Sequence, residues 1–190
     1  MTGVQTCALP ISSTGTGVGP TRIDKVIGVL KAYTTRVGEG PFPTEFTKDL
    51  MEKIRQKGKE FGATTGRPRR CGHFDSVIVK HSIMVNGIDE IVVTKLDVLD
   101  DLDSIKICTA YKFEGKVYSD FPTSCRVLAG CEPVYEEWPG WKEDTTGVTS
   151  YLKLPRDARN YLKRIQSLLK TRIVLISVGC DRKQTFSKDA

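Results

Sequence analysis

The strongest fold signal in this chain of 190 residues is the stretch Glu90-Ile91-Val92-Val93-Thr94-Lys95-Leu96-Asp97. Its apolar centre is β-branched and is typical of a buried strand. The strand signal ends in polar residues, with an aspartate two positions after a lysine. Ligand sites in α/β sheets gather at the carboxyl ends of strands. The stretch therefore predicts a strand followed by a ligand site.

Other strands are expected on both sides of this one. Apolar and alternating runs at 104–113, 116–119 and 173–176 favour strands, with a tight turn near Glu114-Gly115. The last run leads into Ser177-Val178-Gly179, so a second polar segment is expected at a strand end.

Helices are expected between these strands. Apolar spacing predicts a helix over 21–33, and a second helix is expected from Thr44 or Thr47 to about Gly58. A long helix should follow Leu154-Pro155 and reach Leu169, since proline suits a first helical position.

Two segments give weaker signals. Residues 75–86 predict a helix that ends at Asn86-Gly87, but their β-branched content makes a strand the rival interpretation. Residues 12–20 are rich in glycine, serine and threonine and predict a loop. Helices alternating with short apolar strands indicate an α/β fold.

The composition indicates one domain with a core. The sequence is 39% hydrophobic and has no apolar run of membrane-spanning length. The net charge of +6 and the pI of about 9.0 fit phosphate-bearing ligands and nucleic acid equally well.

Residues 62–70, here called the arginine loop, read Gly-Ala-Thr-Thr-Gly-Arg-Pro-Arg-Arg. Glycine lets the backbone approach a ligand closely, and guanidinium groups match carboxylates and phosphates through paired hydrogen bonds. The loop predicts a site for an anionic small substrate.

Asp97 suggests a reader of guanine. A carboxylate can accept hydrogen bonds from the N1–H and the exocyclic amine of that base, while the stem of Lys95 covers the ring. A turn aspartate is the alternative interpretation of Asp97 taken alone.

The cysteines do not form a recognisable metal or disulfide pattern. None of the six forms a CxxC pair, and neither His73 nor His81 lies at zinc spacing from them. Without a secretion signal, reduced thiols in a cytosolic protein are expected, with Cys71 as a small buried residue.

Several longer runs closely resemble adenylosuccinate synthetase. They are 28–45, 62–70, 94–97, Gly140-Trp141 and 177–179. They follow the family's order with family-like gaps from about Gly15 to Thr185. The resemblance is to the C-terminal part of the enzyme and implies a mixed central sheet with flanking helices. His73 departs from the pattern, because the family usually has tryptophan there. We interpret it as a packed substitution and not as a new general base.

The resemblance implies two sets of binding residues. The loop for aspartate and IMP comprises Ala63, Thr64, Thr65, Gly66, Arg67, Pro68 and Arg69, with Arg67 contacting IMP and Arg69 contacting GTP. The guanine of GTP would be held by Lys95, Leu96, Asp97, Ser177, Val178 and Gly179.

The resemblance also implies a reaction. The family phosphorylates the 6-oxygen of IMP from GTP with Mg²⁺, and the amine of L-aspartate then displaces the phosphate to give adenylosuccinate in purine biosynthesis. The family's phosphate loop, catalytic aspartate and histidine, and metal-binding segment lie N-terminal to the matched region. This sequence contains no GxxxxGK loop, and the arginine that a neighbouring subunit contributes to IMP is also missing.

We therefore expect residues 12–190 to be part of a cytoplasmic, homodimeric, GTP-dependent ligase. This part would carry no catalytic or metal-ligating residue and would be inactive alone. Residues 1–11 resemble translated sequencing adapter and are expected to be an artefactual leader.

Two other classes remain open. A stand-alone GTP-binding module would need a phosphate cradle, and none is visible in the sequence. A nucleic-acid-binding protein would use the arginine loop and would group aromatic residues on the same face. Aromatic residues make up only 8% of the chain and show no such grouping.

Overall fold

The structure is a computed structural model that describes residues 13–188. The expected leader, with Cys7, lies outside the described residues. Among residues 13–188, no helix is both long and apolar enough to cross a membrane.

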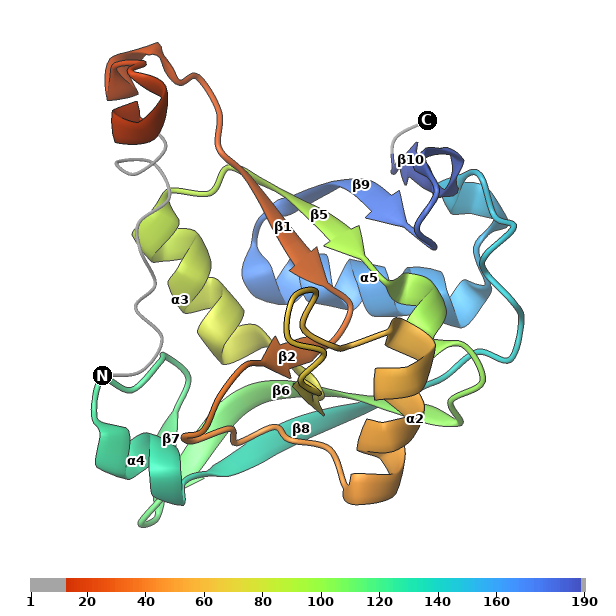
Figure 1. The fold of residues 1–190 in the computed structure, drawn as a ribbon. Coiled ribbons are helices and arrows are strands. Elements are labelled where there is room, and N and C mark those ends of the chain that lie inside the picture. The colour runs from red at the N-terminus through yellow and green to blue at the C-terminus, as the bar shows by residue number, and fades with distance from the viewer. Residues whose placement is uncertain (1–12, 189–190) are drawn as a thin grey trace.

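The central sheet is built on three parallel strands (Figure 1). β1 (Ile27–Lys31) pairs with β5 (Glu90–Thr94), and β5 pairs with β9 (Arg172–Ser177). β10 (Thr185–Ser187) adds to β9 in the antiparallel direction, so the sheet is mixed. The carboxyl ends of the three parallel strands consequently lie at one edge.

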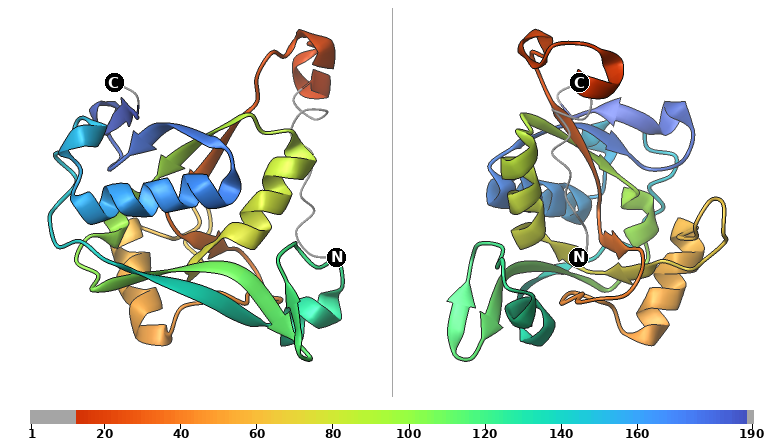
Figure 2. Two further views of the ribbon diagram at one scale, coloured as in Figure 1. Left: turned by 180° about the vertical axis from the view of Figure 1, so that it is seen from behind. Right: turned by 60° about the vertical axis from the view of Figure 1, so that its left-hand side comes forward.

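The helix α5 (Arg156–Leu169) covers the face of this sheet that points away from the viewer in Figure 1, and it lies in front of the strands in the left view of Figure 2. One face of α5 is buried, comprising Ala158, Tyr161, Leu162, Ile165 and Leu169. The hydroxyl of Tyr161 donates to the carbonyl of Ala32 at 2.6 Å, which fixes the helix to the end of β1. This interface forms much of the core and holds the sheet edge in place.

A second sheet forms another layer, which lies below the central sheet in the view of Figure 1. In it β6 (Ser104–Phe113) pairs with β4 (Phe74–Asp75), β7 (Lys116–Tyr118) and β8 (Glu132–Pro139). The short ribbon of β2 (Thr34–Arg36) and β3 (Arg70–Gly72) connects the layers. The remaining elements are η1 (Pro20–Arg22), α2 (Lys48–Gly58), α3 (Ser76–Asn86), η2 (Leu96–Leu99), α4 (Cys125–Gly130), η3 (Tyr151–Lys153) and η4 (Arg182–Gln184).

Most of the expected elements are confirmed. The strands expected at 90–95, 104–113, 116–119 and 173–176 are β5, β6, β7 and β9. Residues 76–86 form the helix α3 and not the rival strand. Asp75 caps its start by accepting from the amides of Val77 and Ile78, and Gly87 ends it at φ 58°.

The helix expected over 21–33 is wrong. Residues 27–31 form β1, because Ile27, Val29 and the glycine between them disfavour a helix and pairing with β5 satisfies the backbone. The loop expected over 12–20 is also partly wrong, since residues 13–16 are helical. Gly17, at φ 71°, follows that turn as a helix-ending residue.

Two helices begin slightly later than the first residues expected from the sequence. α2 begins after Thr47, whereas Thr44 is buried and its carbonyl accepts from the amide of His73 at 2.8 Å. Pro155 precedes α5 as its N-cap and is not its first residue.

Gly140 provides a test of this packing. A Cβ added there would overlap the carbonyl of Leu102, where the chain turns toward the buried Trp141. We expect Gly140→Ala to lower the free energy of unfolding by about 1–3 kcal/mol, as overpacking does. Thermal or urea denaturation would measure it. Gly147→Ala is the matched control, because no atom lies within 4 Å of its added Cβ. Equal stability of the two variants would contradict the packing described.

Candidate functional site

The carboxyl ends of β1 and β5 are locked together. The hydroxyl of Thr94 donates to the carbonyl of Leu30 at 3.0 Å, and the amide of Ala32 donates to the carbonyl of Thr94 at 2.8 Å. Lys95 then takes a left-handed conformation at φ 60°, which turns the chain directly into η2. Asp97 lies in this short helix, so the strand end determines its position.

A pocket of about 250 Å³ opens beside this turn. It is lined by residues from four segments: Lys57, Gly58, Lys59, Lys95, Asp97, Val98, Thr146, Gly179, Cys180 and Gln184. The structure thus brings Lys95 and Asp97, which follow β5, and Gly179, which follows β9, into one cavity. The other expected guanine-site residues, Leu96, Ser177 and Val178, are not part of its lining. Lys57, Lys59, Thr146 and Gln184 were not among the expected site residues.

Asp97 is the unsatisfied group of this pocket. Its Oδ1 atom is buried and has no hydrogen-bond partner among the described residues. Burial, and after it the charge of Asp100, raise the pKa of Asp97 above its ordinary value, against an opposing backbone hydrogen bond. A buried acceptor without a partner is costly, so this oxygen is suited to receive donors from a ligand.

Gly179 is required by close packing at the opposite wall. An added Cβ would overlap the side chain of Gln184. That side chain is held by two hydrogen bonds: it donates to the carbonyl of Thr146 and accepts from the amide of Asp181, both at 2.9 Å. The hydroxyl of Ser177 donates to the carbonyl of Gly179, also at 2.9 Å. Gly179 and Gln184 line the pocket at this wall, whereas Ser177 lies outside the lining and contributes only through its hydrogen bond to Gly179.

Two of the expected site residues point into the core instead. Leu96 and Val178 have no exposed surface, and the amide of Val178 donates to the carbonyl of Gln184. Neither residue exposes surface to a ligand, and their buried side chains anchor the neighbouring residues that line the pocket.

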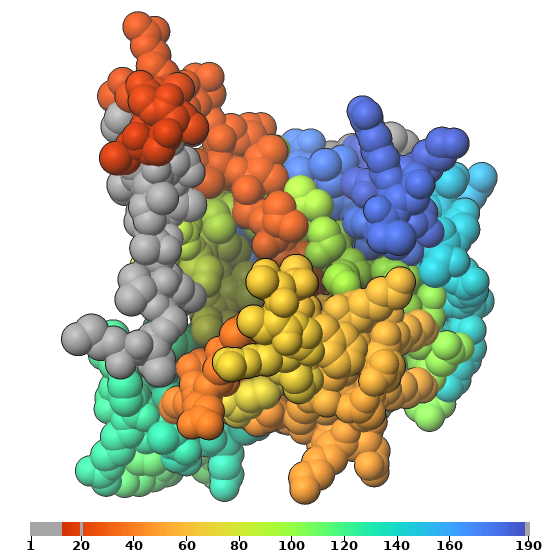
Figure 3. Space-filling view, in the orientation of Figure 1, coloured from red at the N-terminus to blue at the C-terminus, as the bar shows by residue number. Residues whose placement is uncertain are grey.

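The arginine loop stands out between α2 and β1 in the space-filling view (Figure 3). Its base is closed by backbone hydrogen bonds, from Gly62 to the carbonyl of Arg67 and from Arg69 to that of Glu60, each 2.9 Å. Gly66 adopts φ 64°, and residues 63–68 are exposed. The loop therefore presents the Arg67 side chain to solvent, while Arg70 is turned back to Glu45 at 2.5 Å.

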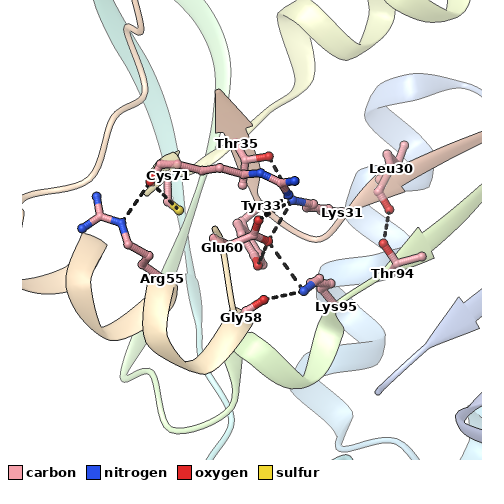
Figure 4. A network of polar contacts seen from close by, with 11 residues as sticks. Leu30, Lys31, Tyr33, Thr35, Arg55, Gly58, Glu60, Cys71, Thr94 and Lys95 are labelled. Carbon is pink, nitrogen blue, oxygen red and sulfur yellow. Dashed lines mark hydrogen bonds and ion pairs between the residues drawn. The ribbon is translucent and has the colours of Figure 1, made fainter. Parts of the chain in front are cut away.

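Glu60 lies where α2 passes into this loop, and its carboxylate is fully buried. The carboxylate accepts hydrogen bonds from Lys31 at 2.7 and 2.8 Å and from the Tyr33 hydroxyl at 2.6 Å (Figure 4). It also accepts one from Arg69 at 3.0 Å. The ammonium of Lys95 lies 3.8 Å away and donates to the carbonyl of Gly58 at 2.5 Å. These five residues are here called the Glu60 cluster. No sequence pattern indicated Glu60, because its partners are distant in the chain.

Histidine and cysteine, which could act as a general base or as metal ligands, have packing roles at His73 and Cys71. His73 contacts the rings of Phe46 and Tyr135 with centroid distances of 4.6 and 5.1 Å. Burial, followed by the charge of Lys106, lowers the pKa of His73 to about 4. Cys71 is fully buried, and burial raises the pKa of its thiol to about 11.

No disulfide or cluster of metal ligands is built from these side chains. Within residues 13–188, all five cysteines are free thiols. The same part of the chain contains no group of three or more histidine, cysteine, aspartate or glutamate residues that could hold a metal ion.

Fold and pocket together define a mixed α/β protein with its candidate site at the strand ends. The family model described as adenylosuccinate synthetase matches residues 2–186, and the chain belongs to this family. The resemblance seen in the sequence is confirmed.

Relatives and a solved structure agree with this assignment. The chain is 58% identical over 172 residues to adenylosuccinate synthetase of Moorella thermoacetica, covering 90% of this chain and 40% of that protein. It is 52% identical over 186 residues to that of Trichlorobacter lovleyi, covering 98% and 43%. The structure of fully ligated adenylosuccinate synthetase from Plasmodium falciparum matches with a TM-score of 0.88 and 40% identity, covering 93% and 42%. The chain thus spans about 40% of the length of these relatives.

The pKa of His73 makes a prediction about acid stability. The folded chain binds this proton only near pH 4, whereas an unfolded histidine binds it near pH 6.5, so protonation favours unfolding between these values. The wild type therefore loses stability as the pH falls below 6.5, and His73→Phe should remove this loss. We expect the unfolding free energy of the variant, minus that of the wild type, to rise by about 2 kcal/mol between pH 7.5 and 5.

Urea denaturation at each pH measures this difference. Between pH 7.5 and 8.5 the gap should stay constant, because neither state of the wild type protonates His73 there. A difference that is also constant down to pH 5 would contradict a half-buried, neutral imidazole at His73.

Proposed function

We propose that the pocket binds the guanine of GTP, and that the protein acts in the ligation of IMP and L-aspartate to adenylosuccinate. Membership of the family and the shared fold support this proposal. In it, this chain supplies recognition of guanine and aspartate. The phosphate loop, the catalytic aspartate and histidine and the metal ligands belong to segments that relatives carry outside the matched region.

The orphaned oxygen of Asp97 is the observation that carries the guanine assignment. Guanine offers the N1–H and the exocyclic amine side by side, and one carboxylate accepts from both. Adenine offers an acceptor at N1, which would face the lone pairs of the carboxylate. Such a site rejects the wrong base strongly, because a mismatch leaves buried polar groups unpaired.

The remaining walls suit a nucleotide. The stem of Lys95 lines the pocket and can cover one face of the base, and Gly179 leaves room at the wall formed by the end of β9. Leu96, Ser177 and Val178 belong to the same expected set. They are buried outside the pocket lining, and we propose that they hold the guanine-contacting residues beside them in place. Arg69, at the base of the arginine loop, would contact the GTP side.

The exposed part of the arginine loop suits the anionic substrates. We assign Ala63, Thr64, Thr65, Gly66, Arg67, Pro68 and Arg69 to aspartate and IMP binding. Arg67 would contact IMP. Its guanidinium is free to form paired hydrogen bonds with a carboxylate or a phosphate, and the hydroxyls of both threonines lie in the same exposed segment.

Mg²⁺, a homodimer and a cytoplasmic location are part of the proposal. Within the described residues the pocket contributes one carboxylate, Asp97, which is too few oxygen ligands for a magnesium site of its own. Mg²⁺ would neutralise the phosphates of GTP, with its protein ligands in other segments of the enzyme. Free thiols fit a reducing compartment.

The nucleic-acid alternative is not favoured. Of the three arginines in the loop only Arg67 is exposed, which is too little for the broad cationic face that a nucleic-acid strand contacts. A module that binds GTP alone is not favoured either, because the chain belongs to a family of ligases.

Asp97→Asn tests base recognition in this chain. Xanthine carries a carbonyl where guanine carries the amine, and an asparagine offers the matching donor and acceptor in nearly the same volume. We expect wild-type protein to prefer GDP to XDP and ADP, and the variant to prefer XDP to GDP. A lost charge-assisted hydrogen bond contributes about 1.5–3 kcal/mol, so GDP affinity should fall roughly ten- to a hundredfold.

Isothermal titration with the three diphosphates measures these affinities. Asp103→Asn is the control, because Asp103 is exposed, pairs with Lys142 and lies outside the pocket. If Asp97→Asn keeps the wild-type preference for GDP, the aspartate only closes a turn and the guanine site lies elsewhere.

Arg67→Leu tests the substrate loop in a complete enzyme, made by joining this chain to the N-terminal part of the Moorella thermoacetica relative. The variant should raise the KM for aspartate and lower kcat, roughly ten- to a hundredfold together, and leave the KM for GTP nearly unchanged. Steady-state kinetics with each substrate varied in turn measures this. Arg126→Leu removes an exposed arginine that pairs with Glu114 and should change neither constant. Unchanged aspartate and IMP kinetics in Arg67→Leu would remove the loop from the proposal.

A further inference from the structure

The Glu60 cluster joins the two halves of the proposed site. Arg69 belongs to the arginine loop, Lys95 lines the base pocket, and Lys31 ends β1. All three cations meet at the carboxylate of Glu60, which follows α2 closely; Figure 4 labels Lys31 and Lys95 beside it. No other acidic side chain among the described residues forms ion pairs with cations from both the loop and the pocket.

The charges in this cluster do not cancel. Three cations surround a single carboxylate, so the cluster carries a surplus of positive charge. Burial lowers the pKa of Lys31, and the charges of Arg69 and Lys95 lower it further, although Glu60 opposes this. The cations therefore repel one another, and the carboxylate is what keeps them together.

The cations also have a route to water. Their side chains are 23%, 33% and 36% exposed for Lys31, Arg69 and Lys95, whereas the Glu60 side chain is fully buried. Without the negative charge, the two long side chains nearest the pocket could turn outward at little cost. The position of Arg69 at the base of the loop thus depends on Glu60. That of Lys95 along the pocket wall depends on Glu60 together with the carbonyl of Gly58, to which its ammonium donates at 2.5 Å.

We propose that Glu60 is a positioning residue for the nucleotide site: it holds Lys95 against the pocket and Arg69 at the base of the loop, and so pre-organises both for an anionic nucleotide. This inference rests on the proposed function. Glu60 would not touch the ligand itself. Because three cations surround this one carboxylate, the cluster keeps a net positive charge that can attract phosphates. The negative charge of Glu60 keeps the cations from turning away into solvent.

A purely structural ion pair would also lower stability when broken, so stability alone does not test the proposal. Glu60→Gln keeps the shape and the hydrogen bond with Tyr33 but removes the charge. We expect its affinity for GDP to fall about tenfold or more, as on loss of charge-assisted contacts. Titration calorimetry of the full chain measures the affinity, and circular dichroism confirms that the variant is folded.

Tyr33→Phe is the matched control. It removes a hydrogen bond to the same carboxylate, at 2.6 Å, but leaves all three cations in place. It should lower the melting temperature and change GDP affinity less than about threefold. Equal losses of affinity in Tyr33→Phe and Glu60→Gln would show that packing, and not cation placement, determines binding.

A double-mutant cycle separates action through Lys95 from general damage. Lys95→Met alone should weaken GDP binding, and adding it to Glu60→Gln should weaken binding little further, because the lysine is already displaced. Additive losses would overturn the positioning role.

Glu60→Asp keeps the proposal testable if Glu60→Gln does not fold. It retains the charge but shortens the side chain by one methylene, so it should bind GDP with an affinity between wild type and Glu60→Gln, at least about threefold below wild type. Wild-type affinity in Glu60→Asp or Glu60→Gln would overturn the inference. Wild-type protein that does not bind GDP would instead contradict the proposed function.

Discussion

The parallel pairing of β1, β5 and β9 is the constraint on which the rest of the structure depends. In this register Lys31 lies beside Thr94, and Val93 lies beside Ile176. Segments more than 60 residues apart in sequence therefore end at the same edge of the sheet. The left-handed turn at Lys95 and the fixed side chain of Gln184 then convert this edge into a pocket. The core beneath, with α5 attached to β1 through Tyr161, holds the strands in that register.

Buried charge completes the site. Burial opposes ionisation of Glu60, but hydrogen bonds from Lys31 and Tyr33 and the charges of Lys31 and Lys95 leave the pKa of the carboxyl below its ordinary value. The carboxylate is consequently charged at neutral pH and fixes the cations around it. Asp97 differs, because burial raises its pKa and one of its oxygens has no partner. The Glu60 carboxylate thus fixes the cations around it, whereas the Asp97 carboxylate is suited to bind a ligand.

The sequence predicted the elements whose local signals agree with their packing. β5, β6 and β9 are short apolar or alternating runs, and α3 has both of its caps in the sequence at Asp75 and Gly87. The helix expected over 21–33 failed because apolar residues at helical spacing occurred by chance in a segment that gains more by pairing with β5. The strand β8 was missed because its glutamates and two prolines give it no strand-like pattern, although it pairs with β6 along most of its length.

In the candidate site, too, the sequence predicted some residues and not others. Lys95, Asp97 and Gly179 were expected from the sequence, and they line one pocket. Glu60, Thr146 and Gln184 could not be found in this way, since each gains its role from residues brought near by the fold. Glu60 follows two helix-ending residues and has the sequence context of a solvated surface glutamate, yet it is fully buried.

The central claim is that the strand ends form a guanine-specific pocket. Amide chemical-shift mapping by ¹⁵N NMR, with GDP and ADP titrated into the chain, tests it most directly. The account predicts saturable GDP shifts at Lys95 to Val98, Thr146, Gly179 and Gln184, with much smaller shifts from ADP. Equal shifts from both nucleotides, confined to the arginine loop, would show simple anion binding and would contradict the claim.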